Sequence, residues 1–271
     1  MTGSLHVTLE DRVASARSLA IRGINRILRH AGVRLAPLGP GRERPGFPDI
    51  EPWVSRIVSE VRPFTMTSDE RLSALCHATR HVARHRVPGD IVECGVWRGG
   101  SSMAAAMTLL AERDESRTLY LFDTFEGMTE PGEFDRAALS GETAHSLLEK
   151  SERSANVWAY APLNDVRANL RKTRYRQDRI HFIKGRVEDT IPSQAPDRIA
   201  ILRLDTDWYE STKHELLHLY PRLSTGGILV IDDYGHWQGA RRAVDEYIEE
   251  NRLNLLLHRI DYTGRLAIKV G

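Results

Sequence analysis

The sequence predicts an α/β fold with a doubly wound, mostly parallel sheet and an antiparallel hairpin at its C-terminal end. From Asp90 onward, five short apolar segments typical of buried strands alternate with longer segments of helical periodicity. Connections of this length join strands that run parallel. After the fifth strand, two further segments flank a Tyr-Thr-Gly turn. This spacing predicts a hairpin that adds an antiparallel edge to the sheet.

The elements follow one another in a regular order. A helix is expected over residues 68–86, because Ser68 and the two acidic residues after it suit a helix start, and Pro88 and Gly89 end the segment. The expected strands are 90–96, 118–125, 180–185, 199–207 and 226–234. The expected helices are 101–113, 163–173, 211–223 and 237–250, and the hairpin comprises 253–261 and 265–270.

Two parts of the chain do not follow this alternation. Residues 1–50 are predicted to form an N-terminal helical extension and linker, and the first 45 residues hold eight Arg and three acidic residues. A basic amphipathic helix in this part could pack on its own domain, contact a second subunit or lie on a membrane surface. Residues 126–161 fit neither period, so we expect a lid inserted into a catalytic domain that spans 51–271.

Composition excludes several classes of protein. Lys and Arg number 38 against 37 Asp and Glu, a formal net charge of +1, which argues against a broadly basic surface for nucleic acid. No apolar run approaches the roughly 18 residues of a membrane span, and the N-terminus has no secretory apolar region. Two cysteines, Cys76 and Cys94, allow neither a disulfide framework nor a four-cysteine zinc site. We therefore expect a cytoplasmic protein.

The first segment that carries chemistry is ECGVWRGGSS, from Glu93 to Ser102. A strand enters a glycine-bearing loop and a helix follows, so free backbone N–H groups can face an anionic ligand. The pattern is neither the dinucleotide fingerprint nor a P-loop, because Trp97 occupies the second glycine position and no Gly-Lys-Ser/Thr follows. A tight turn without a ligand remains the alternative.

Asp123 ends the next strand. An acid at this place can accept hydrogen bonds from both ribose hydroxyls of a nucleoside cofactor. A carboxylate there can also simply cap the following segment. Taken with the glycine loop, Asp123 favours a nucleoside site at the carboxyl ends of the strands.

Three further carboxylates follow two other strands. Asp205 ends one strand, and Asp232 and Asp233 end the next. Neighbouring strands lie about 4.8 Å apart, so these side chains would converge if the two strands are neighbours. Converging like charges favour a bound hard cation such as Mg²⁺, with Ca²⁺ and Mn²⁺ as other candidates. The alternative is that the carboxylates pair with basic side chains, namely Arg203, Lys213 or Arg241.

Asp207 is the candidate general base. Residues i and i+2 of a strand share a face, so Asp207 is expected to point into the same cleft as Asp205. A metal makes a bound hydroxyl acidic, and a carboxylate can then take its proton. His236 is the competing base.

Five ordered segments resemble a known family. They are VPGDIVECGVWRGGSSM, LYLFDTFEGM, RIHFIKGRVEDTIP, LRLDTDWYEST and VIDDYGHWQGARRAVDEY, within residues 60–262. They resemble the macrocin (tylosin/mycinamicin) O-methyltransferase family, which includes the methyltransferase of novobiocin's noviose sugar. The resemblance implies a class I methyltransferase (Rossmann-like) fold, S-adenosylmethionine as methyl donor, a divalent metal, usually Mg²⁺, and a homodimer or higher homo-oligomer. It also implies an acceptor hydroxyl on the sugar of a glycosylated natural product, such as a macrolide-like antibiotic.

The resemblance also implies roles for individual residues. The implied cofactor site comprises Glu93, Gly95, Ser101, Ser102, Asp123, Gly185, Val187, Glu188 and Asp205. The implied metal ligands are Asp205, Asp232 and Asp233, and Asp207 is the implied base. Other acceptors remain open, namely a catechol-like phenol or the sugar of a cell-envelope glycolipid or polysaccharide. A non-catalytic nucleoside-binding scaffold is a third class, but it would have no use for clustered carboxylates.

Overall fold

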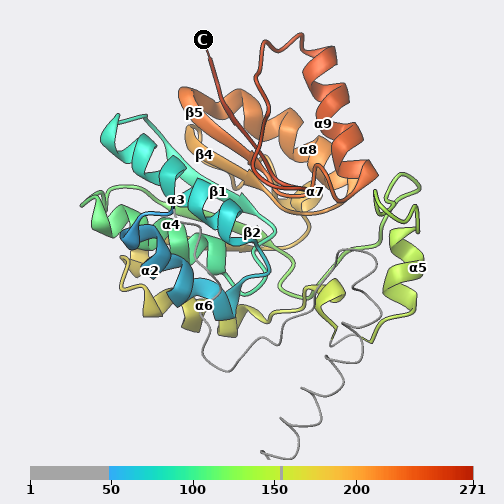
Figure 1. Ribbon diagram of the computed structural model, residues 1–271, viewed down its shortest axis with the longest axis horizontal. Helices are drawn as coiled ribbons and strands as arrows, with labels where there is room; N and C mark the ends of the chain where they lie inside the picture. Colours follow the sequence, from blue (N-terminus) through green and yellow to red (C-terminus); the bar gives the residue numbers. More distant parts are fainter. Residues whose placement is uncertain (1–48, 153–154, 271) are drawn as a thin grey trace, which may run out of the picture. The chain divides into compact units, whose positions relative to one another are not determined.

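The computed structural model describes residues 49–152 and 155–270. Within the compact unit Ile50–Gly271, seven strands form one sheet in the order β3-β2-β1-β4-β5-β7-β6 (Figure 1). Strands β1 to β5 pair in parallel, whereas β7 pairs antiparallel with β5 and β6 pairs antiparallel with β7. The predicted α/β class, with its mostly parallel sheet and C-terminal antiparallel edge, is confirmed.

Most elements lie within a few residues of their predicted bounds. The strands are β1 (Asp90–Cys94), β2 (Leu119–Asp123), β3 (Ile180–Lys184), β4 (Ile199–Leu204), β5 (Leu223–Ile231), β6 (His258–Arg259) and β7 (Arg265–Ile268). The α-helices are α2 (Pro52–Val61), α3 (Asp69–Arg84), α4 (Gly100–Ala111), α5 (Ala144–Glu149), α6 (Leu163–Lys172), α7 (Val187–Thr190), α8 (Tyr209–Leu219) and α9 (Gln238–Glu250). Ser68 caps α3 as expected, because its side chain accepts a hydrogen bond from the Arg71 N–H.

Helices cover both faces of the sheet (Figure 1). Helices α2, α3, α4 and α6 lie on one face, and α7, α8 and α9 lie on the other. Neighbouring residues of a strand therefore enter different cores: Ile91 of β1 packs in one apolar cluster and Val92 in the other. This burial on both faces explains why the central strands are apolar without alternation.

Several parts of the fold differ from the prediction, and the short helix α7 is one that was not predicted. The expected strand 253–261 is wrong over most of its length, because β7 spans four residues and only His258 and Arg259 pair with it. Helix α2 was not predicted; Pro52 begins it, and its buried valines and isoleucine pack in the core with α3 and α4. Within the lid segment 126–161, the side chain of Thr143 caps the short helix α5, which period analysis did not detect.

Several predictions concern parts of the chain that the structure does not describe. The expected helix within residues 1–50, with its membrane, intramolecular or dimer contacts, lies almost wholly outside the described residues.

Among the helices that are described, none combines the length and the apolar character that a membrane span requires. Cys76 and Cys94 are free thiols, both buried.

Candidate active site at the carboxyl ends of the strands

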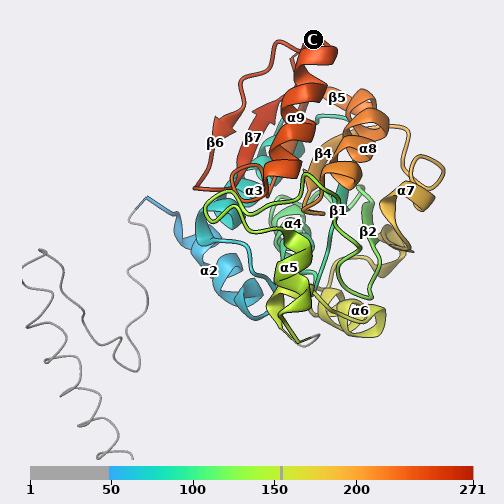
Figure 2. The ribbon, with the colours of Figure 1, turned by 90° about the vertical axis from the view of Figure 1, so that its right-hand side faces the viewer.

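A cavity of about 400 Å³ opens where strands β1 to β5 end. The segments that follow all five of these strands line it, together with the start of α3 and both ends of the lid. Figure 2 views the unit from the side that carries α5. Ligands of open α/β sheets bind at the carboxyl ends of the strands, so the cavity lies where the fold favours binding.

The glycine loop after β1 forms one wall. Gly95 has φ +82°, and a Cβ atom there would collide with the backbone carbonyl oxygen of Asp205. Gly99, with φ +89°, is the N-cap of α4, so the first N–H groups of that helix lie next to the loop. Gly95 and Ser101 line the cavity. The geometry therefore suits close approach of a ligand to the backbone.

Glu93 and Ser102 lie beneath this wall and do not line the cavity. Both are buried; the Ser102 hydroxyl donates a hydrogen bond to Glu93, and Arg203 Nη1 donates to Glu93 Oε1 at 2.7 Å. Burial raises the pKa of Glu93, which the neighbouring Arg203 opposes. The hydrogen bond between Ser102 and Glu93 joins β1 to the first turn of α4, the two elements that flank the loop.

Asp123 lines the cavity and also holds the glycine loop. One carboxylate oxygen accepts the N–H groups of Val96 and Trp97 at 2.6 and 3.0 Å, and the other accepts that of Phe125 at 2.6 Å. The capping role that the sequence left open is thus realised. Because each carboxylate oxygen has two lone pairs, this capping leaves acceptor capacity for a ligand hydroxyl.

The loop after β3 forms the far end of the cavity. Gly185, Val187 and Glu188 line it, as does Arg186, whose Nε lies 3.4 Å from a carboxylate oxygen of Glu188. Gly185 has φ +147°, which side chains rarely permit. These three members of the predicted cofactor site therefore share one cavity with Gly95 and Asp123.

Carboxylates converge at the ends of β4 and β5. These strands are neighbours, and oxygen atoms of Asp205, Asp232 and Asp233 lie within 4.8 Å of one another. Oδ2 of Asp233 is buried and has no hydrogen-bond partner among the described residues. Burial raises the pKa of Asp205 and that of Asp233 well above the ordinary range. An all-oxygen set with an unpartnered buried atom fits a hard divalent cation.

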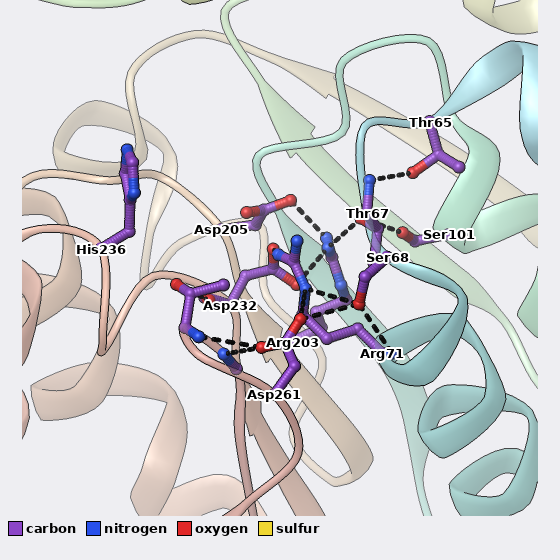
Figure 3. Close-up of polar contacts among 12 residues, drawn as sticks. Thr65, Thr67, Ser68, Arg71, Ser101, Arg203, Asp205, Asp232, His236 and Asp261 are labelled. Carbon is purple, nitrogen blue, oxygen red and sulfur yellow. Dashed lines mark hydrogen bonds and ion pairs between the residues drawn. The ribbon is translucent and has the colours of Figure 1, made fainter. Parts of the chain in front are cut away.

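Two arginines enter the same cluster (Figure 3). Arg203 on β4 lies 2.7 Å from both Asp205 Oδ2 and Asp232 Oδ1, and Arg71 of α3 pairs with the other oxygen of Asp232. The Nε atom of Arg71 also contacts Asp261 at 3.0 Å. The alternative prediction, that basic side chains pair with the carboxylates, is therefore partly confirmed, because Arg203 pairs with Asp205 and Asp232. The other two basic candidates pair elsewhere, Lys213 with Glu246 and Arg241 with Asp245.

Asp207 faces the cluster from a turn. Strand β4 ends at Leu204, and Asp207 has φ +67°, so it does not reach the cleft by the strand alternation that the sequence suggested. The indole N–H of Trp237 donates to Asp207 Oδ1 at 2.8 Å. Burial and the charge of Asp205 raise the pKa of Asp207 to about 7. A carboxyl of that pKa suits proton transfer near neutral pH.

His236 lines the cavity away from this network (Figure 3). Its Nδ1 atom forms a 2.9 Å hydrogen bond with the hydroxyl of Tyr262. Burial, followed by the charge of Arg71, lowers the pKa of His236. The competing base is thus bound to an exposed tyrosine at the edge of the site.

The lid is anchored beside the carboxylates. Trp208 and Trp237 meet edge to face with centroids 5.0 Å apart and pack against Ala144 and Leu148 of α5. Buried Asp135 accepts the N–H of Tyr209, at the start of α8, at 2.8 Å. Both contacts join the lid to the segments that carry Asp207 and Asp233.

Replacing Gly95 with Ala should prevent cofactor binding and strongly destabilise the fold, because the new Cβ atom displaces the end of β4. The matched control is Gly141→Ala, since Gly141 also has a positive φ, +71°, but nothing lies within 4 Å of its added Cβ. The control should lose only about 1–2 kcal/mol of stability, the cost of a left-handed conformation for a residue with a Cβ atom. Thermal unfolding and calorimetry with S-adenosylmethionine measure both effects. Equal losses in the two variants would show that the contact with Asp205 is unimportant.

Comparison with known proteins connects most of the described chain to one family. The family model described as "Macrocin-O-methyltransferase (TylF)" matches residues 58–267. The match includes all five strand ends around the cavity.

Individual relatives agree with this match. The chain is 37% identical over 222 residues to 8-demethyl-8-(2,3-dimethoxy-α-L-rhamnosyl)-tetracenomycin-C 4'-O-methyltransferase of Streptomyces olivaceus, covering 81% of this chain and 80% of the relative. It is 36% identical over 186 residues to demethyldecarbamoylnovobiocin O-methyltransferase of Streptomyces niveus, covering 68% and 67%. Among solved structures, the O-methyltransferase NovP superposes with a TM-score of 0.68 at 33% identity, over 77% of this chain and 83% of NovP.

Proposed function

This chain belongs to the macrocin O-methyltransferase family, and from this premise we propose that it methylates a hydroxyl group on the sugar of a glycosylated natural product with the help of Mg²⁺. The family match and the likeness to NovP confirm the prediction of an S-adenosylmethionine-dependent O-methyltransferase with a class I methyltransferase fold. The acceptor, the metal and the residue roles are proposals. The predicted homo-oligomer stays a prediction.

One observation carries the proposal: three carboxylates and a fourth acid, Asp207, meet in the cavity that also contains the glycine loop and Asp123. We assign the methyl donor to the part between Gly95 and Glu188, with Asp123 facing its ribose. The acceptor then lies between the donor and the carboxylates. This arrangement brings a hydroxyl, a base and a methyl group into one cavity.

The carboxylate cluster supports a divalent cation. Asp205, Asp232 and Asp233 would hold it, and the unpartnered Oδ2 of Asp233 is available as a ligand. When bound, such a cation orients an acceptor and makes its hydroxyl more acidic.

The protein's own residues then carry out the transfer. Asp207 accepts the proton of the acceptor hydroxyl at its carboxylate. The hydroxyl oxygen forms a bond to the methyl carbon, the carbon–sulfur bond breaks, and its electron pair remains on sulfur, which gives S-adenosylhomocysteine. Trp237 keeps one oxygen of Asp207 fixed by its 2.8 Å hydrogen bond. Met128 and Val157 of the lid line the cavity and exclude water from it.

A product screen tests this function. The purified chain is incubated with ¹³C-methyl-labelled S-adenosylmethionine and Mg²⁺, and with the demethylated acceptors for which the two curated relatives are named. Catechol and cell-envelope glycolipid serve as acceptors of the other classes. A labelled methyl on a sugar oxygen, located by mass spectrometry and NMR, supports the proposal. Transfer to catechol or glycolipid alone would contradict the acceptor class, and no binding of S-adenosylmethionine would contradict the enzyme.

Removing divalent metal should abolish turnover, because the neighbouring carboxylates need a cation to hold an acceptor between them. We expect activity to fall to background in excess EDTA and to return when Mg²⁺ is added beyond the chelator. The measurement is initial rate against free Mg²⁺. Calorimetry of S-adenosylmethionine in EDTA is the control, since donor binding should persist. Full activity in excess chelator would contradict the metal assignment.

A further inference from the structure

Glu215 is a buried acid that neither the cavity nor the proposed chemistry uses. It lies on α8 with no exposed surface, and the apolar residues Leu216 and Leu219 of the same helix are buried too. Its Oε1 atom accepts a hydrogen bond from the Thr206 hydroxyl at 2.9 Å. Its Oε2 atom is buried without a hydrogen-bond partner among the described residues, and the thiol of Cys94 lies beside the carboxyl group.

An acid at this position does not serve stability. Burying a carboxyl group costs free energy that one hydrogen bond to a hydroxyl only partly offsets. An apolar side chain of similar size would fill the same space at lower cost. Burial raises the pKa of Glu215 well above its ordinary range. What distinguishes Glu215 from an apolar residue is its contact with Thr206.

Thr206 lies between Asp205 and Asp207, in the turn that presents both acids. Its carbonyl oxygen accepts the Trp208 N–H at 2.8 Å and the Ser211 hydroxyl at 3.4 Å. Asp207 itself has φ +67°, in the left-handed region, where a residue other than glycine has a cost in free energy that surrounding contacts offset. Glu215 holds the side chain of the residue that precedes this strained position.

We infer that Glu215 is a positioning residue that, through Thr206, fixes the left-handed turn and thereby aims the Asp207 carboxylate at the acceptor. The catalytic consequence of this inference rests on the proposed function. The structural consequence is independent of that function: without Glu215 the turn relaxes, and the hydrogen bond between Asp207 and Trp237 changes.

The first test follows that hydrogen bond. The chain has five tryptophans, so ¹⁵N-indole labelling gives a small set of N–H resonances, and Trp237→Phe identifies the one of interest. We expect Glu215→Leu to shift the Trp237 resonance and to increase its hydrogen exchange. Glu215→Gln keeps a carbonyl acceptor for Thr206 and should leave the resonance in place. A wild-type resonance in Glu215→Leu would overturn the inference.

The second test measures turnover with an acceptor from the product screen. We expect kcat to fall about 10- to 100-fold in Glu215→Leu, the loss that small misplacement of a reacting group causes. The melting temperature should stay equal or rise, because a buried acid has been removed. Thr206→Val should lose a similar factor, and the double variant should lose no more than either single variant. Glu215→Gln should retain wild-type kcat and the same affinity for S-adenosylmethionine.

The two tests separate the possible failures. If Glu215→Leu loses stability while kcat per folded molecule is unchanged, the residue is only structural and the inference is wrong. The same holds if Glu215→Gln loses as much kcat as Glu215→Leu, because the acceptor for Thr206 is then irrelevant. If the wild-type chain methylates no acceptor in the screen, the proposed function fails, and the Trp237 resonance still decides whether Glu215 holds the turn.

Discussion

Asp207→Asn abolishes methyl transfer and leaves S-adenosylmethionine binding intact: this is the result we expect if Asp207 is the base. The amide has the shape of the carboxylate and still offers an oxygen to the Trp237 indole, which lies 2.8 Å from Asp207 Oδ1. It cannot accept the acceptor proton at neutral pH. Loss of a general base reduces rates by about 10²- to 10⁴-fold. Labelled-methyl transfer measures the rate, and calorimetry measures donor affinity.

A matched control separates this effect from a general loss of charge. Asp178 is an exposed acid paired with Arg176 at 2.5 Å, and Asp178→Asn should retain full activity. Substantial activity in Asp207→Asn would move the base to His236, which lines the same cavity. If His236 is the base, His236→Gln should be inactive. If Asp207 is the base, His236→Gln should keep most of its turnover, because His236 is hydrogen-bonded to Tyr262.

The fold was predictable because burial leaves a strong pattern. Each parallel strand is buried on both faces, so its sequence is an unbroken apolar run between segments of helical periodicity. The alternation of such runs with helices is enough to predict that the strands pair in parallel. The lid and the C-terminal edge lack that pattern. Residues 253–261 are apolar enough for a strand, but only His258 and Arg259 among them pair with β7. Helix α5 has six residues, fewer than two turns, and leaves little periodicity to detect.

The carboxylate cluster was predictable from strand order alone. Neighbouring parallel strands end at the same edge, so Asp205 and Asp232 had to lie close together once β4 and β5 paired. Of the two grounds for Asp207, the strand alternation does not hold, and the family resemblance is independent of it. The strand ends before it, and a left-handed turn, which no sequence period encodes, directs its side chain to the cluster.

Sequence reasoning missed two residues, Arg71 and Glu215, whose roles depend on the tertiary structure. Arg71 reaches Asp232 across 161 positions, and on its own helix it is one of several arginines. Glu215 reads as an ordinary polar residue of a surface helix, because its burial depends on how α8 packs. A helical wheel shows which face of the helix a residue occupies, but it does not show which acid or hydroxyl of another element lies opposite that face.

Arg203→Met should destabilise the protein by about 3–5 kcal/mol, the effect of leaving buried charges without their partner. Arg203 is buried on β4, and its guanidinium lies 2.7 Å from oxygens of Glu93, Asp205 and Asp232. Methionine fills the space but offers no donor to any of the three acids. In a domain of this size the loss lowers the melting temperature by on the order of 10 °C. Arg241→Met is the surface control, since Arg241 and its partner Asp245 are both exposed.

Two further measurements show whether uncompensated charge is the cause of that loss. Adding Glu93→Gln to Arg203→Met removes one of the buried acids and should restore part of the stability, although each substitution alone is harmful. Mg²⁺ should raise the melting temperature of Arg203→Met more than that of the unaltered protein, because a cation bound to the native state replaces the missing positive charge. If the double variant is no more stable than Arg203→Met and Mg²⁺ stabilises both proteins equally, Arg203 does not balance the carboxylates. Its contribution would then lie in packing alone, and the cation would bind independently of it.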